Sequence, residues 1–71
     1  MNDILIKKIS EPHQTIVVLA GEGYVALELF FDDDARVADE AVLLGLSGAE
    51  ALAYSLSGAV IKAREAASQR N

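Results

Sequence analysis

Residues 15–31, "TIVVLAGEGYVALELFF", decide the fold. Two runs of β-branched, aliphatic and aromatic residues, 15–20 and 24–31, flank the segment "GEG". Such runs favour β-strands, and glycine tolerates the positive φ angles that tight turns require. We therefore predict a β-hairpin. Residues 3–10, "DILIKKIS", predict an earlier strand that ends before Pro12, which cannot donate a backbone hydrogen bond. Together the three strands would form an antiparallel meander.

Both faces of this predicted sheet are apolar. Alternation along the third strand divides its side chains between the faces, with Val25, Leu27, Leu29 and Phe31 on one and Tyr24, Ala26, Glu28 and Phe30 on the other. An antiparallel sheet that is covered on one side normally presents a polar face to water. This sheet is therefore expected to be covered on both sides.

The C-terminal third predicts a helix from about residue 48 to 68. Ser47 and Glu50 have the spacing of a capping box. The helical stripe that we expect to pack on the sheet comprises Leu52, Leu56, Val60, Ala63 and Ala67, flanked by Ala53 and Ala59. Residues 35–46 are ambiguous: "EAVLLGL", 40–46, fits a fourth strand, whereas Val37, Ala41 and Leu44 have the spacing of a short helix with Asp34 as N-cap that ends near Gly45. The short run "AVLL" before Gly45 favours the strand. The fold class is α+β: one domain, 1–71, with an antiparallel sheet of three or four strands packed on one C-terminal helix.

Composition predicts association with a second chain. The chain has 71 residues, of which 52% are hydrophobic, and so small a domain has little interior in which to bury them. We expect a homodimer. The candidate dimer or partner interface is Tyr24 and Phe30 on the sheet and Tyr54, Gly58 and Ile61 on the helix. The absence of cysteine and of a long apolar run favours a soluble, cytoplasmic protein with no membrane contact.

The acidic residues are concentrated in one segment. From Glu28 to Glu40 there are six acids and one base, a sum of −5 that equals the net charge of the whole chain. The candidate partner-binding residues are Asp32, Asp33, Asp34, Asp39 and Glu40, which would attract a basic protein. The alternatives are a solubilising loop and a calcium loop. The calcium pattern fails because Arg36 holds a ligand position and Val37 stands where glycine is required.

No pattern of catalytic residues stands out. His13 is the single histidine and follows Pro12 in a predicted turn, there is no cysteine nucleophile, and no serine has a base at an interpretable spacing. We expect no catalytic residues, no cofactor and no metal ligand, and hence not an enzyme.

Residues 39–58 resemble the helix-turn-helix of bacterial repressors through Ala41, Gly45, Leu46 and Ser47. The resemblance implies DNA binding, yet residues 47–61 contain no Lys, Arg, Asn or Gln to contact phosphates or bases. A looser resemblance, over residues 41–60, is to the strand-then-helix ending of many small bacterial and phage proteins. Our leading hypothesis is a small acidic interaction module that binds no nucleic acid directly. By analogy with phage-encoded inhibitors, it would act as a phage or mobile-element inhibitor of a host nucleic-acid-binding protein. The alternative is an atypical helix-turn-helix transcriptional regulator.

Overall fold

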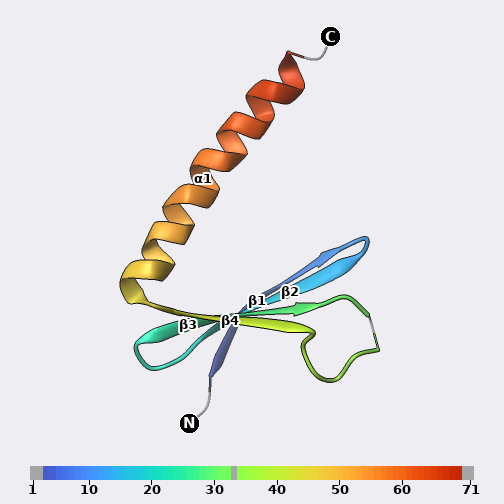
Figure 1. Cartoon of the computed structure of the whole chain (residues 1–71), viewed down its shortest axis with the longest axis vertical. Coiled ribbons are helices and arrows are strands. Elements are labelled where there is room, and N and C mark those ends of the chain that lie inside the picture. The colour runs from blue at the N-terminus through green and yellow to red at the C-terminus, as the bar shows by residue number, and fades with distance from the viewer. Residues whose placement is uncertain (1–2, 33, 70–71) are drawn as a thin grey trace.

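The computed structural model describes residues 3–32 and 34–69, which form four strands followed by one helix. Their bounds are β1 Ile4–Glu11, β2 Gln14–Ala20, β3 Tyr24–Phe30, β4 Glu40–Gly45 and α1 Leu46–Ser68 (Figure 1). The strands lie in the order β1-β2-β3-β4, and each pair is antiparallel. The predicted α+β class is confirmed, and the preferred fourth strand over the ambiguous segment is present.

The two hairpin turns lie where the sequence predicts. Pro12 and His13 join β1 to β2 between the paired residues Glu11 and Gln14. In the next turn the N–H of Gly21 donates to the carbonyl of Tyr24 at 2.9 Å. Gly23 has a φ of 84°, a conformation that side chains with a Cβ rarely adopt. The central hairpin is therefore built around a glycine that its turn requires.

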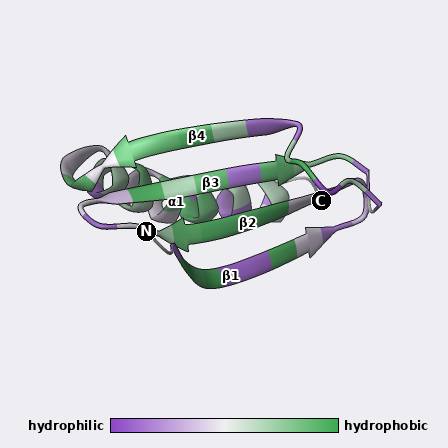
Figure 2. Ribbon diagram, turned by 90° about the horizontal axis from the view of Figure 1, so that it is seen from below, coloured by the Kyte–Doolittle hydropathy of each residue, from purple (hydrophilic) through white to green (hydrophobic). Residues whose placement is uncertain are grey.

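The strand register defines two faces of the sheet, because successive side chains point to opposite sides. The outer face carries Leu5, Lys8, Ser10, Thr15, Val17, Leu19, Tyr24, Ala26, Glu28, Phe30, Ala41 and Leu43. The helix-side face carries Ile4, Lys7, Ile9, Glu11, Gln14, Ile16, Val18, Ala20, Val25, Leu27, Leu29, Glu40, Val42 and Leu44. Its charged residues among those that the register pairs are Lys7, Glu11 and Glu40, all on the two edge strands. Figure 2 shows the sheet with α1 behind it.

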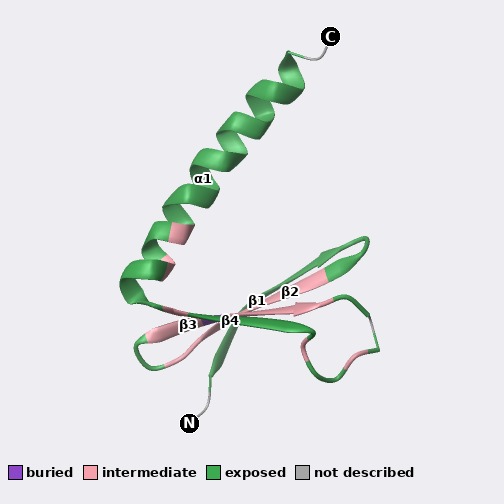
Figure 3. Cartoon of the chain, in the orientation of Figure 1, coloured by how far each residue is buried: buried purple, intermediate pink, exposed green. Residues whose placement is uncertain are grey.

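α1 starts on the helix-side face and then leaves it. A Cβ added to Gly48 would lie 3.7 Å from the Leu44 side chain, which fixes the side of the sheet on which the helix starts. Within the helix, Ala49 and Leu52 are half-buried and all other described side chains are exposed (Figure 3). The prediction that the stripe packs on the sheet is therefore wrong beyond Leu52. The helix projects from the end of β4 and spans about 34 Å at 1.5 Å per residue (Figure 1).

The predicted capping box does not form. Gly45 is the N-cap, and no side chain caps the helix. The reason is that β4 continues directly into α1 at Leu46, which places Ser47 inside the first turn, past the position from which it could accept from the exposed amides.

A closed core is absent from the described part of the chain. Ala26, 5% exposed, is the one buried residue there. The chain has an accessible surface of 5944 Å². A compact monomer of its mass, 7.5 kDa, would expose about 4200 Å². About 1700 Å² is thus exposed beyond what a compact monomer of this size shows.

Candidate functional site

The largest candidate site is the uncovered apolar surface formed by the helix-side face and the adjoining side of α1. The side chains of Ile9 and Val42 are 38% and 42% exposed. The helix-side residues of β2 and β3 that lie between them, Ile16, Val18, Leu27 and Leu29, are only half-buried. On α1, Leu56 and Val60 continue the side of the helix that carries Leu52, yet they are 56% and 48% exposed. An apolar surface of this extent is typical of a contact with another polypeptide.

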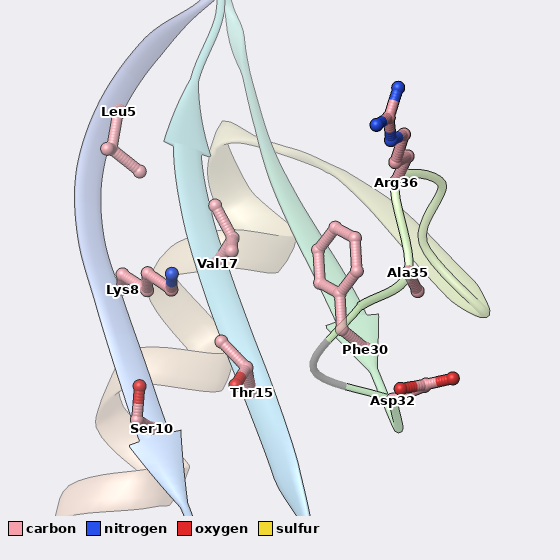
Figure 4. A pocket seen from close by; sticks show the side chains of 9 residues that line it. All are labelled: Leu5, Lys8, Ser10, Thr15, Val17, Phe30, Asp32, Ala35 and Arg36. Atoms are coloured by element: carbon pink, nitrogen blue, oxygen red, sulfur yellow. The ribbon is translucent and has the colours of Figure 1, made fainter.

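The outer face carries an open hollow rather than a flat apolar surface. Its lining comprises Leu5, Lys8, Ser10, Thr15, Val17, Phe30, Asp32, Ala35 and Arg36, from β1, β2, the end of β3 and the loop after it (Figure 4). The hollow contains the hydroxyl groups of Ser10 and Thr15. Among the described residues, no imidazole or carboxylate is hydrogen-bonded to either of them. The arrangement can hold a polar or anionic group against the sheet, but it contains no activated nucleophile.

The acidic segment forms a structured loop between β3 and β4. The N–H of Phe31 donates to Asp39 Oδ2 at 2.7 Å, and the N–H of Asp39 donates to the Leu29 carbonyl at 2.8 Å. The N–H of Asp34 donates to Asp32 Oδ1 at 3.0 Å. Asp39 therefore closes the base of the loop, while Asp32 stabilises the turn within it.

The loop places its acids on different surfaces. Asp32 and Asp34 are exposed, and Asp32 also lines the hollow of the outer face. Glu40, by contrast, pairs with Leu29 and belongs to the helix-side face. Asp33 lies outside the described residues. Among those that are described, no three metal-ligating side chains come together as a site for a metal ion.

The predicted interface residues do not form one surface either. Tyr24 and Phe30 lie at opposite ends of β3 on the outer face. Tyr54, 84% exposed, and Ile61 lie on the side of α1 that points away from the sheet, with Gly58 between them. The acidic loop lies at the far end of β4 from the start of α1 (Figure 1). Acidic and helical residues would thus contact a partner separately.

Tyr24 makes the one side chain–side chain hydrogen bond of the described residues. Its hydroxyl donates to Asp3 Oδ1 at 2.6 Å, and this bond, followed by burial and the charge of Asp3, raises the pKa of Tyr24. The ring lies where a Cβ on Gly21 would be. Tyr24 is thus held at the N-terminal end of β3, and sequence patterns alone gave no sign of this contact.

Comparison with known proteins adds no relative, since no protein-family model, curated protein or solved structure matches the chain. Nor does the helix-turn-helix resemblance extend to the fold, because residues 40–45 form β4 where the first helix would lie. No helix within the described residues has both the length and the apolar character required to cross a bilayer.

Proposed function

We propose that this chain is a non-enzymatic interaction module that completes its apolar core by binding another polypeptide. The observation that carries the proposal is the near absence of buried side chains: Ala26 alone is buried among the described residues, although 52% of the chain is hydrophobic. Each large apolar side chain that moves from water into an interface contributes roughly 1.5–3 kcal/mol. A partner that covers the helix-side face and α1 supplies the burial that the single chain lacks.

The test is the dependence of folding on association. We expect the purified chain to lose its cooperative thermal transition and to bind a dye for exposed apolar surface when it is diluted away from any partner, because the folded state is coupled to binding. Circular dichroism and dye fluorescence over a wide range of concentration measure this. A cooperative transition with a midpoint independent of concentration, in a monomer that binds no dye, would refute the proposal.

The acidic loop gives the assembled module a second contact, with a basic protein. Support comes from the exposed carboxylates of Asp32 and Asp34, which make no ion pair with any described residue. Clustered charge of one sign steers an oppositely charged partner and makes its binding sensitive to salt. In its most specific form, this proposal makes the protein an inhibitor that occupies the basic groove of a nucleic-acid-binding protein.

A charge-matched pair of variants tests the loop. In D32N/D34N the amides keep the hydrogen-bonding capacity of the turn but remove two charges, whereas E11Q/E22Q removes two charges from exposed residues of β1 and the β2–β3 turn. Fluorescence anisotropy with a labelled oligo-arginine peptide should show several-fold weaker, less salt-sensitive binding for D32N/D34N only. An equal loss in both variants would mean that only net charge matters and that the loop merely aids solubility.

A further inference from the structure

We infer that this chain forms a two-fold dimer in which the two α1 helices run antiparallel. The α1 helix of one copy covers the helix-side face and the α1 helix of the other copy. The inference rests on the proposed function and names its partner. Three observations support it: the area left exposed, the pattern of apolar residues along α1, and the charges beside that pattern.

The exposed area matches what a homodimer buries. If each chain covers its excess of about 1700 Å², two chains together bury about 3400 Å². Obligate homodimers bury about 2000–5000 Å², and their interfaces are more apolar than those of transient complexes. A second copy brings an equal uncovered surface, so one two-fold contact removes both excesses at once.

The apolar residues of α1 divide into a side for its own sheet and a seam for another helix. Leu52 lies against the sheet and is half-buried. Next to Leu52 on the helix surface lies a row of residues, here called the seam, that are spaced alternately by four and three positions: Ala49, Ala53, Leu56, Val60, Ala63 and Ala67. That spacing is the heptad pattern by which two helices pack along their length. Beyond Ala49 the described seam residues are exposed, and the alanines permit close approach of a second helix.

Charge selects the antiparallel orientation. Glu50 and Arg64 border the same edge of the seam, two heptads apart, whereas Lys62 already pairs with Glu65 at 3.5 Å on another side of α1. In an antiparallel pair, like edges meet across the two-fold axis. A crossing near Ser57 therefore places Glu50 beside Arg64 of the partner subunit, twice in each dimer. A parallel pair would place the charged edge against the edge that carries Leu52 and leave both charges unpaired.

Neighbouring substitutions in α1 provide the first test. Val60 lies in the seam and Ile61 points away from the sheet, yet their side chains are similarly exposed in the single chain, at 48% and 55%. By sedimentation equilibrium, we expect V60E to raise the dimer dissociation constant by about a hundredfold or more, because two carboxylates would be buried without partners. I61E should change it by less than about threefold. Dissociation by I61E instead would place the interface on Tyr54 and Ile61 and overturn the inference.

A charge exchange tests the orientation without placing a charge in the seam. E50K and R64E should each weaken the dimer by about tenfold at low salt, and E50K/R64E should restore it to within about threefold. Absence of that restoration would overturn the antiparallel arrangement.

The wild-type result separates this inference from the proposed function. A folded, concentration-independent monomer would overturn both. A monomer without a cooperative transition would overturn the second copy and leave a different polypeptide as the partner. A dimer that V60E leaves intact would overturn the helical seam and keep the interaction module.

Discussion

β3 and α1 both carry apolar side chains, but their backbones are hydrogen-bonded in different ways. β3 takes its hydrogen bonds from β2 on one side and β4 on the other, and it contains the one buried described residue, Ala26. α1 satisfies its backbone within itself, so it can extend past the sheet with Leu56 56% exposed. A strand requires neighbouring strands for its backbone hydrogen bonds, whereas a helix makes these bonds within itself and can form before its apolar side is covered.

That difference separates folding from assembly. The meander is specified by local hairpins, since every pairing joins consecutive strands. α1 has 23 residues but contacts the sheet only near its start. In proteins, most of the stability of a helix comes from packing of its apolar side rather than from intrinsic propensity, so we expect α1 to be stabilised by the polypeptide that packs on it. The sheet is thus specified by contacts within one chain, whereas α1 presents an apolar side that is available for contact with another polypeptide.

Replacing one glycine in the sheet and one in α1 with alanine tests this comparison, and of the predictions made here it should change the free energy of unfolding most. Gly23 has a φ of 84° in the β2–β3 turn, so G23A should lower the free energy of unfolding by about 1 kcal/mol or more through backbone strain. Gly58 lies inside α1, and a Cβ there would meet nothing within 4 Å. G58A should therefore raise the free energy of unfolding by up to about 1 kcal/mol through helix propensity.

Urea unfolding at one fixed protein concentration measures both changes, because association shifts the apparent stability. A destabilising G58A would contradict the assignment of this side of α1 to solvent. It would show instead that another backbone approaches Gly58 closely, as the sequence hypothesis for Tyr54, Gly58 and Ile61 requires.

Most of the fold could be predicted because its signals are local. The glycine-containing turn, the β-branched runs and the run "AVLL" before Gly45 each act over a few residues, and the predicted strands lie within one residue of those observed. The capping box failed because it depends on where β4 ends, and that point is set by pairing with Tyr24. The helix begins two residues earlier than predicted, with Gly45 instead of Ser47 as its N-cap, so Ser47 lies inside the helix.

The candidate surfaces were harder to predict because they depend on long-range placement. Composition indicates that apolar surface is left exposed. It does not show that this surface includes both the helix-side face of the sheet and the side of α1 that adjoins it. From their closeness in the sequence, Asp32, Asp39 and Glu40 are predicted to form one acidic surface. In the structure Asp39 closes the loop, Glu40 faces the helix side and Asp32 faces the outer hollow.

The hydrogen bond between Tyr24 and Asp3 should have the smallest effect on stability. Removing it tests whether this side-chain contact helps to hold the start of β3. The hydroxyl donates only while it is protonated, so the hydrogen bond raises the pKa of Tyr24 above its ordinary value of 10.0. A group whose pKa is raised on folding contributes stability that is fully present below the unfolded pKa and is lost as pH rises through the folded value. The contribution is therefore complete at neutral pH and disappears above about pH 10.

Absorbance titration of the phenolate in a Y54F background isolates Tyr24, because the chain has two tyrosines. D3A should return the pKa of Tyr24 towards 10.0 by removing both the acceptor and the charge, and D3N should lie between D3A and the parent because it keeps a neutral acceptor. Identical titrations in all three proteins would show that Asp3 does not hold the tyrosine. The start of β3 would then depend on backbone pairing with β2 and β4 alone, which would make the contrast with α1 sharper still.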